Sequence, residues 1–369
     1  MIIIKIPEFY SNEVGILKTA GLHIAKYGKN ALIIGGKTAL SVVANQLYKS
    51  LEEYHVKFTV KEFAGLVTEQ EIQEYTVYAQ EAEADLIIGV GGGKAIDLAK
   101  AVADNAKIDA VTVPTIASTC AAWSALSTLY KADGSVKGAS HQPKSPVLVL
   151  ADPDIIANAP IRYLKAGIGD TIAKWYEYAP KLNERYDDVA LLSSLHTAQF
   201  ILDVIEEYAL IAIKEAGGEK ATKAVKQIID AVIFLAGLVG SAKDEHLVLN
   251  FVHAHAIDHS LVRLPEASDS LHGERVIYGQ IVQLILENKP DAQVEKLVAQ
   301  IHELGLPISL KQFGITENLP EKIKIIARGV DLKRVGLDKP NEEKLIIKIE
   351  QAILKAEVMG KKYYEARTK

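Results

Sequence analysis

Short apolar runs alternate with longer segments of helical spacing through the first part of the chain. The apolar runs are continuous, as in strands of a parallel sheet that is covered on both faces. This alternation of strands and helices predicts an open α/β sheet with right-handed crossovers. The predicted strands are residues 30–36, 57–63, 84–91, 109–115 and 146–153, and the predicted helices are 38–54, 68–83 and 94–105.

The pattern changes after Pro160. No further strand-like runs follow, and long segments with helical spacing continue almost to Lys369. We therefore predict two domains, an α/β domain of residues 1–158 and an all-helical domain of residues 159–369.

Composition narrows the class of protein. A chain of 369 residues that is 49% hydrophobic can bury the core of two domains, and its net charge of −5 offers no field to attract nucleic acid or anionic lipid. The single cysteine, Cys120, permits no intrachain disulfide and suits a reducing cytosol. The longest apolar run, Ala231–Gly240, is about half of what a bilayer span requires. We expect a cytoplasmic protein with no nucleic-acid or membrane partner.

A glycine run ends the third predicted strand. In "IIGVGGGKAIDLAKA", the strand leads into Gly91, Gly92 and Gly93, and a helix opens at Lys94. Glycine lets the backbone approach a phosphate, while the helix N-terminus and the lysine add positive charge. The run departs from the usual dinucleotide fingerprint, because Lys94 stands where the last glycine would be. Phosphate binding is favoured over a tight turn without a ligand.

A second polar loop, "VPTIASTCAAWSALSTLYKADG", follows the next strand. Loops after parallel strands lie at the carboxyl edge of the sheet, where open α/β folds bind ligands. Small hydroxyl groups there would bond a pyrophosphate or a nicotinamide carboxamide, although serine and threonine also fill turns. The hydroxyl residues are Thr115, Ser118, Thr119, Ser124 and Ser127.

The segment "HAHAIDHSLVRLPEASDSLHGE" holds four of the ten histidines, which is more imidazole than core packing requires. They are His253, His255, His259 and His272.

Four motifs, "GVGGGKAID", "PTIASTCAAWSALSTLY", "GIGDTIAKWYE" and "HAHAIDHSL…LHGE", occur in the order and spacing of a known family. The chain resembles the metal-dependent alcohol dehydrogenases often called iron-containing, and within them the glycerol dehydrogenases. The resemblance implies a Rossmann-like N-terminal domain and an all-α C-terminal domain, the fold that glycerol dehydrogenase shares with dehydroquinate synthase. It also implies a catalytic divalent metal in the cleft between the domains, acting as a Lewis acid beside NAD(P).

The resemblance also implies the binding residues. The metal ligands fall on Asp170, His255 and His272, a three-ligand set with an open position of the kind that catalytic zinc takes. The iron-preferring branch has a further histidine where this chain has Lys174, so zinc is favoured, although such a site accepts several metals. The implied cofactor contacts are Gly93, Lys94, Asp97, Thr115, Ser118, Ser124, Leu126 and Tyr130.

Two neighbours of the ligands keep open alternatives. His259 lies four residues after His255 on the same helical face, and is either a relay or support beside the metal or a buried histidine with satisfied hydrogen bonds. Asp258 either orients an imidazole or has a surface or capping role. His253 points elsewhere around the helix and is expected to be structural.

Two departures from the glycerol dehydrogenase pattern concern the substrate. Cys120 replaces an aspartate that contacts the polyol in that branch, with Trp123 narrowing the space nearby. Lys174 lies one turn beyond Asp170 and can reach toward the metal. Together they favour a carboxylate substrate and resemble the hydroxycarboxylate dehydrogenases, which interconvert 2-hydroxy and 2-oxo acids. If Lys174 extends to solvent instead, glycerol or another small diol is the alternative substrate.

A third departure concerns the cofactor. NAD-preferring members carry an aspartate for the adenosine ribose where this chain has Gly36, followed by Lys37. An aspartate repels a 2′-phosphate, whereas glycine with lysine accommodates it, so NADP is favoured over NAD.

Three rival classes are less favoured. A dehydroquinate synthase-like lyase or a glycerol-phosphate dehydrogenase would need more basic residues near Asp170 and His272. A non-catalytic nucleotide-binding protein would lack the metal ligands. We expect an enzyme that acts on a small molecule, as a homo-oligomer.

Overall fold

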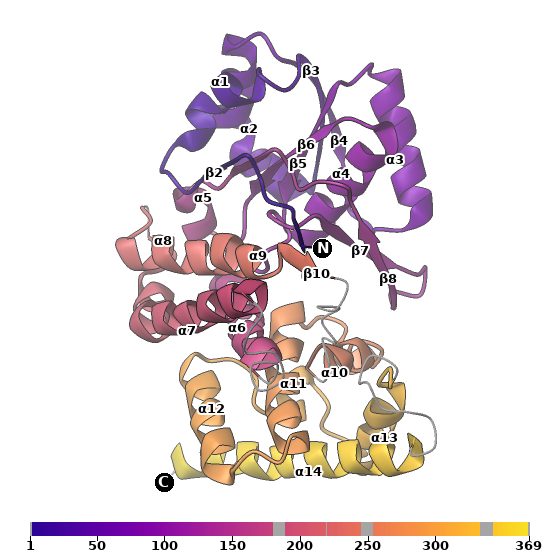
Figure 1. Cartoon of the computed structure of the whole chain (residues 1–369), viewed down its shortest axis with the longest axis vertical. Coiled ribbons are helices and arrows are strands. Elements are labelled where there is room, and N and C mark those ends of the chain that lie inside the picture. The colour runs from indigo at the N-terminus through magenta and orange to yellow at the C-terminus, as the bar shows by residue number, and fades with distance from the viewer. Residues whose placement is uncertain (1, 180–188, 219, 245–253, 333–341, 368–369) are drawn as a thin grey trace. The chain divides into compact units, whose positions relative to one another are not determined.

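The computed structural model describes most of the chain (Figure 1). The described residues are 2–179, 189–218, 220–244, 254–332 and 342–367. They form two compact units: unit 1 comprises Met1–Leu164 and Val189–Glu245, and unit 2 comprises Lys165–Asp188 and His246–Lys369.

Unit 1 contains a six-stranded sheet in which every strand pairing is parallel. The five predicted strands all belong to it, which confirms the predicted α/β fold. The strand that the sequence did not predict, β2, adds only three residues at one edge. The order is β2 (Phe9–Ser11), β9 (Leu148–Leu150), β6 (Asp109–Pro114), β5 (Leu86–Gly91), β3 (Asn30–Gly35) and β4 (Lys57–Glu62).

Helices cover both faces of this sheet (Figure 1). On β3, Ile33 packs with α1 (Ala20–Ile24) and α2 (Lys37–Glu53). The next residue, Ile34, belongs to the other core, with α3 (Glu69–Glu81) and α4 (Gly93–Ala106). Successive side chains of a strand point to opposite faces, so burial of both faces requires apolar residues at consecutive positions.

Unit 1 also contains two small antiparallel strand pairs. β7 (Leu126–Tyr130) lies within the hydroxyl-rich stretch and forms a hairpin with β8 (Val136–His141). At the N-terminus, β1 (Ile2–Ile4) pairs with β10 (Ala242–Asp244). The latter corrects the expectation that no strand follows Pro160, because a three-residue strand formed with a partner so distant in sequence carries no local pattern.

The division into units differs from the predicted boundary between residues 158 and 159, because Val189–Glu245 returns to unit 1. The contacts are specific: Tyr10 on β2 donates to Asp230 over 2.7 Å, and its ring stacks on Phe234 at a centroid distance of 5.6 Å. Helical spacing predicted the helices correctly but carries no information on which unit buries their apolar faces. The helices between the sheet and residue 240, most of α6 excepted, belong to unit 1. They are α5 (Pro153–Ala157), α6 (Ile161–Tyr178), α7 (Val189–Glu215), α8 (Lys223–Asp230), the π-helix η3 (Ala231–Leu235) and α9 (Ala236–Val239).

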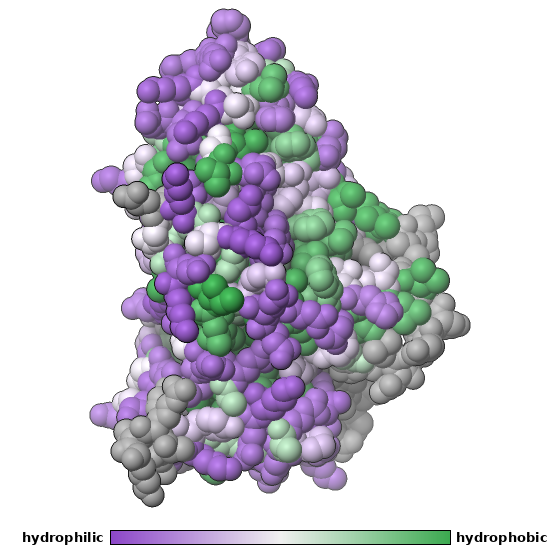
Figure 2. Space-filling view, turned by 90° about the vertical axis from the view of Figure 1, so that its left-hand side faces the viewer, coloured by the Kyte–Doolittle hydropathy of each residue, from purple (hydrophilic) through white to green (hydrophobic). Residues whose placement is uncertain are grey.

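Every described element of unit 2 is a helix, as predicted. Its elements, besides most of α6, are α10 (Ala254–Leu261), η4 (Pro265–Ala267), α11 (His272–Leu286), α12 (Asp291–Glu303), η5 (Leu310–Phe313), α13 (Leu319–Gly329) and α14 (Glu342–Arg367). Among the helices that the structure describes, none has the length and apolar character needed to cross a bilayer. On the face shown in Figure 2, hydrophilic residues predominate and hydrophobic groups lie among them.

Candidate functional site

The carboxyl edge of the sheet in unit 1 brings two glycine-containing loops together. The chain runs from β3 to β4 on one side and then to β5 on the other side of β3. Gly35 therefore lies in register with Val90, and the loops that follow β3 and β5 are neighbours. Such a reversal of strand order is where open α/β sheets bind ligands.

The glycine loop leaves space above the N-terminus of α4. Gly91 has φ 138°, which strongly favours glycine. A Cβ at Gly92 would lie 2.6 Å from Ile116 Cδ1, whereas one at Gly93 would meet nothing closer than Thr119 Oγ1 at 3.7 Å. The first N–H groups of a helix have no intrahelical acceptor, so this opening suits an anion. Lys94 is exposed, with Nζ 5.8 Å from the centroid of the Tyr130 ring.

Asp97, a predicted cofactor contact, is buried and engaged within unit 1. Its Oδ2 accepts the N–H of Thr128 at 3.0 Å, and its Oδ1 lies 2.9 Å from the ammonium of Lys100. These contacts fasten β7 to α4, and β7 carries the predicted contacts Leu126 and Tyr130. Asp97 thus positions other candidate residues in this structure.

The hydroxyl-rich loop has a partly exposed polar side and a buried apolar side. Ser118, Ser124 and Cys120 are partly exposed, while Thr115 is buried with its N–H donating to Gly91 O at 3.1 Å. Trp123 was predicted beside the substrate, but its side chain is only 4% exposed. It donates from Nε1 to Ser241 Oγ at 2.9 Å and packs on Phe234 and Gly237. These contacts make Trp123 a support beneath the loop.

The loop after β3 leads directly into α2. Gly36 precedes the helix in an extended conformation, with φ −74°, and a Cβ there would contact only Phe63 O at 3.7 Å. Lys37 is exposed at the first position of α2, whose first turn has no acidic residue. A negative group would therefore meet a helix N-terminus and a lysine.

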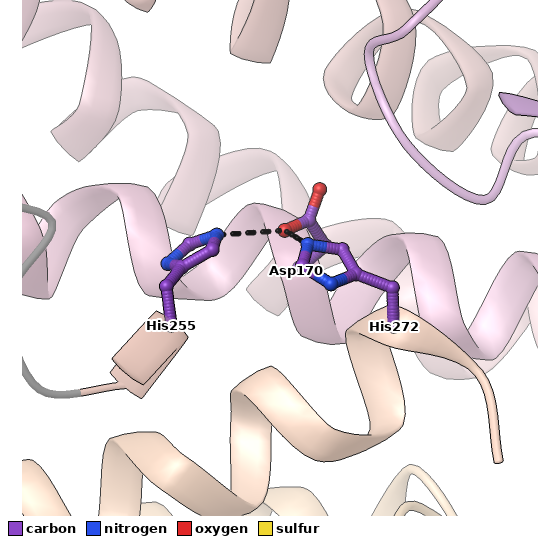
Figure 3. A group of neighbouring side chains, drawn as sticks. All are labelled: Asp170, His255 and His272. Carbon is purple, nitrogen blue, oxygen red and sulfur yellow. Dashed lines mark ion pairs between the residues drawn. The ribbon is translucent and has the colours of Figure 1, made fainter. Parts of the chain in front are cut away.

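In unit 2, three helices bring Asp170, His255 and His272 together (Figure 3). Asp170 lies on α6, His255 near the start of α10 and His272 at the first position of α11. One donor atom from each lies within 4.8 Å of the others. Asp170 Oδ1 is 3.8 Å from His255 Nε2 and 3.4 Å from His272 Nε2.

Glycines let these helices approach closely. A Cβ at Gly273 on α11 would lie 1.8 Å from Ala166 O on α6, and one at Gly279 would lie 2.5 Å from Ala254 O on α10. Neither distance is compatible with a side chain, so backbone contacts set the spacing of the helices. Short side chains from three segments can then meet at one point.

Each imidazole has a carboxylate at its Nδ1. Glu177 contacts His255 Nδ1, and Asp258 Oδ2 lies 3.0 Å from His272 Nδ1. Asp258 in turn accepts a hydrogen bond from Arg275 Nε at 2.6 Å. A carboxylate held against Nδ1 orients a ligating imidazole and leaves Nε2 for the metal. Both Nε2 atoms lie toward Asp170 in this way.

The donor group fits a divalent cation. Asp170 Oδ1 is buried and faces the Nε2 atoms of both histidines. Burial raises the pKa of Asp170, but the positive charges of Lys174, His272 and His255 outweigh it and hold the pKa below its ordinary value. One ionised carboxylate oxygen and two imidazole nitrogens are a common donor set for catalytic zinc and similar ions.

The pKa of His272 is coupled to the same group. Burial lowers this pKa, but Asp258 and Asp170 outweigh burial and raise it to about 10. Without an ion His272 therefore keeps its proton at neutral pH, and metal binding has to release it.

Lys174 and His259 lie near this group without being part of its donor set. The Lys174 side chain is only 10% exposed, with Nζ 3.8 Å from Glu177 Oε2, so it does not extend to solvent. Its positive charge lowers the pKa of Asp170. His259 Nε2 is 3.8 Å from Asp258 Oδ2, beside the carboxylate that holds His272. His253 lies outside the described residues.

Sequence reasoning missed several members of this arrangement. Glu177 carried a signal, because Asp170, Lys174 and Glu177 have the spacing i, i+4 and i+7 of one helical face. Arg275 carried none, since its role depends on a contact between α10 and α11. For Asp258 the structure favours the prediction that it orients an imidazole over a surface or capping role. The imidazole is that of His272, on the neighbouring helix α11.

Similarity to known proteins covers both units. The sequence profile described as iron-containing alcohol dehydrogenase matches residues 7–153. A glycerol dehydrogenase from Escherichia coli O6:H1 is 32% identical over 329 residues, 88% of each chain. Hydroxycarboxylate dehydrogenase A from Escherichia coli K12 is 34% identical over 300 residues, 80% of this chain and 81% of that one.

The fold is also shared with a solved structure, that of glycerol dehydrogenase from Schizosaccharomyces pombe. Its TM-score is 0.87 at 27% identity, over 99% of this chain and 93% of that one. Since a profile match, a relative similar along most of its length and a shared fold all agree, the chain belongs to the iron-containing alcohol dehydrogenase family and is an oxidoreductase that acts on alcohols.

Proposed function

We propose that the protein is a metal-dependent, NAD(P)-linked dehydrogenase that transfers hydride between nicotinamide and a small 2-hydroxy or 2-oxo acid. The observation that carries the proposal is the placement of Lys174, whose buried ammonium acts on the metal ligand Asp170. A substrate carboxylate near the metal would find a positive charge there that a neutral polyol does not need.

The charge balance of the metal group supports an anionic substrate. With both imidazoles neutral as ligands of a bound metal, the group contains three carboxylates, Asp170, Glu177 and Asp258, and two permanent cations, Lys174 and Arg275. A divalent ion would add two positive charges and leave this cluster with one. At low effective dielectric a net positive charge attracts the carboxylate of an acid, whereas a neutral polyol gains no such attraction.

Cys120 in unit 1 supports the same substrate class. Its side chain is partly exposed in the hydroxyl-rich loop, where related glycerol dehydrogenases are expected to carry an acidic residue. A thiol neither repels a carboxylate nor accepts hydrogen bonds from a polyol as an ionised acid does.

Each residue of the metal group has a separate task in this proposal. When bound, the divalent ion, zinc in our proposal, supplies a Lewis acid for the substrate oxygen and the nicotinamide supplies the hydride acceptor. Asp170, His255 and His272 hold the ion, and Lys174 attracts the carboxylate. His259, whose side chain is 23% exposed beside Asp258, is proposed to pass the substrate proton to water.

For the cofactor, we propose that NADP(H) is used at least as well as NAD(H). Gly36 places no carboxylate at the N-terminus of α2, and Lys37 supplies a positive charge there. The pyrophosphate would bind over Gly91, Gly92 and Gly93, beside Lys94.

A glycerol or small-diol dehydrogenase is the second candidate function. The observation that favours it is the 32% identity to a protein named glycerol dehydrogenase. A dehydroquinate synthase-like lyase is a more remote candidate, which would bind nicotinamide but show no net turnover of it. Self-association to a homo-oligomer is a further part of the proposal, and light scattering of the purified protein tests it.

The test is a comparison of substrates. NADPH and NADH oxidation should be measured with small 2-oxo acids and with dihydroxyacetone in the presence of zinc, and the proposal expects the acids to be reduced with higher kcat/KM. Lys174→Met should lower kcat/KM for the acids about ten- to a hundredfold, the worth of one charge-assisted contact, and affect dihydroxyacetone less. Cys120→Asp should shift preference toward uncharged diols, because a negative charge at this position repels a carboxylate.

Lys165→Met is the matched control, since Lys165 lies on the same helix but outside the metal group. Efficient turnover of glycerol or dihydroxyacetone by the unaltered chain, with no 2-oxo acid accepted, would contradict the acid proposal and leave the diol alternative.

A further inference from the structure

Lys100 is a buried cation that the proposed chemistry does not use. It lies on α4, six residues after Lys94, and only 2% of it is exposed. Burying an ammonium is costly unless its N–H groups all find acceptors. The groups that accept hydrogen bonds from Lys100 are therefore held in place by its ammonium.

The acceptors of Lys100 come almost entirely from residues 121–126, which are the end of the loop before β7 and the first residue of β7. Its Nζ donates to Ala121 O at 2.8 Å, to Ser124 O at 3.0 Å and to Leu126 O, and Ser124 Oγ lies at 3.3 Å. Asp97 Oδ1 adds a carboxylate at 2.9 Å. Three backbone carbonyls of one short segment thus converge on one charge, as they would around a bound cation.

Other contacts hold this segment at Ala122 and the strand after it at Ser127, independently of Lys100. The Thr112 hydroxyl donates to Ala122 O at 2.8 Å, and Ser127 Oγ donates to Asp97 O at 2.8 Å. Loss of the ammonium would therefore release the carbonyls of Ala121 and Ser124 and leave Leu126 O with the Ser124 hydroxyl at 3.4 Å, while the sheet and the β7–β8 hairpin keep their anchors.

The position of the segment along the sheet edge indicates which half of a dinucleotide it meets. The strands run in the order β3, β5, β6, and the segment follows β6. If the pyrophosphate lies over the glycine loop after β5 and the adenosine half lies toward Gly36 after β3, the nicotinamide half lies toward the segment after β6.

We propose that Lys100 is a positioning residue, whose ammonium fixes the backbone of residues 121–126 in the shape that binds the nicotinamide half of the cofactor. The inference rests on the proposed function, because it takes the dinucleotide to be NAD(P). It assigns Lys100 no contact with cofactor or substrate.

The experiment compares two ligands that share the adenosine and pyrophosphate parts. Dissociation constants for NADH and for ADP-ribose, which lacks nicotinamide, are measured by calorimetry on the full-length protein and on Lys100→Met. Lys100→Met should weaken NADH binding about tenfold, as expected if the displaced backbone loses one hydrogen bond to the nicotinamide half, and leave ADP-ribose binding unchanged. Equal weakening of both ligands, or no change in either, would overturn the inference.

Two control variants separate positioning from general destabilisation. Ser50→Ala removes a buried hydrogen bond of unit 1, in which Gly21 N donates to Ser50 Oγ at 2.9 Å, far along the chain from the segment. Lys107→Met removes an exposed lysine at the end of α4. Both should leave the ratio of the two dissociation constants unchanged even where Tm falls.

A readout without nucleotide keeps the two proposals distinguishable. The chain has two tryptophans, so in a Trp175→Phe background the emission reports Trp123 alone, which lies within the segment and is buried. Lys100→Met should shift this emission to longer wavelength and increase its quenching by acrylamide. If the unaltered protein binds neither nucleotide, the proposed function fails. The emission of Trp123 then tests the positioning role by itself, and an unchanged spectrum in Lys100→Met rejects that role as well.

Discussion

At the edge of the sheet in unit 1, the candidate ligand groups are backbone N–H groups and small hydroxyls around an open space. In unit 2 they are ionised side chains packed among helices, with Asp170 and His272 each surrounded by opposite charges. The first kind of site depends on many weak, separate donors. The second depends on a few strong charges that hold one another in place, so the two should respond differently to mutation and pH.

The largest effect is expected from His272→Ala. Loss of one of three donors should remove the bound metal and lower activity by more than the roughly 10–100-fold that the loss of a ligand's supporting partner costs. ADP-ribose binding by unit 1 should be unchanged. Metal content by elemental analysis and calorimetry with ADP-ribose check both halves, with the exposed His196→Ala as a control. Full activity in a metal-free protein would show that the charged group of unit 2 is not a metal site and would end the comparison between the two sites.

The next largest effects concern the carboxylates behind the imidazoles. Asp258→Asn and Glu177→Gln should each weaken zinc binding about 10–100-fold, measured by competition with a chelator. Asp258→Asn should also lower the free energy of unfolding by about 3 kcal/mol, because Arg275, whose side chain is 9% exposed, loses its carboxylate. Equal stability losses in the two variants would show that the Arg275 pair adds nothing.

In unit 1, the double variant Gly36→Asp, Lys37→Ala should shift the ratio of kcat/KM for NADPH to that for NADH by about one to two decades toward NADH. The structure permits the exchange, since a Cβ at Gly36 meets only Phe63 O, at ordinary contact distance. Zinc affinity should not change. A protein that already prefers NADH strongly, or an unchanged ratio, would place the discriminating contact elsewhere.

The smallest expected effect, counted per pH unit, is the change of zinc affinity with pH. Because the pKa of His272 is raised from 6.5 to about 10, zinc affinity should rise about tenfold per pH unit between these values as the competing proton is lost. The metal-free protein should show the opposite trend. A raised folded-state pKa contributes stability that is complete below pH 6.5 and is lost as pH approaches 10.

Thermal unfolding with and without zinc across this pH range tests both trends. The His272 side chain is 36% exposed, so water screens part of the interaction and the stability change should be modest. Glu177→Gln should keep the trend, whereas Asp258→Asn should flatten it, because Asp258 is the partner of His272.

The sequence predicted the structure correctly where it depends on neighbouring residues, as at the turn between β5 and α4. The glycine loop joins a strand to the next helix within one short segment, so its glycines and lysine could be recognised from their order. Lys100 escaped notice, although it lies in the same quoted motif, because its acceptors lie more than twenty residues further along the chain. The metal ligands were named through resemblance, which transfers positions but not the contacts around them.

Residue order alone determined five strands of the six-stranded sheet, the helices α2, α3 and α4 between them, the glycine turn at Gly91–Gly93 and the residue types available for a metal, because these depend on neighbours along the chain. Only the tertiary structure decided that Val189–Glu245 joins the sheet unit, that Trp123 supports its loop from beneath, and that Asp258 serves His272. Those outcomes depend on which helix faces meet. That is set by packing between distant segments, such as the contact of Gly273 with Ala166, and no periodicity in the sequence encodes it.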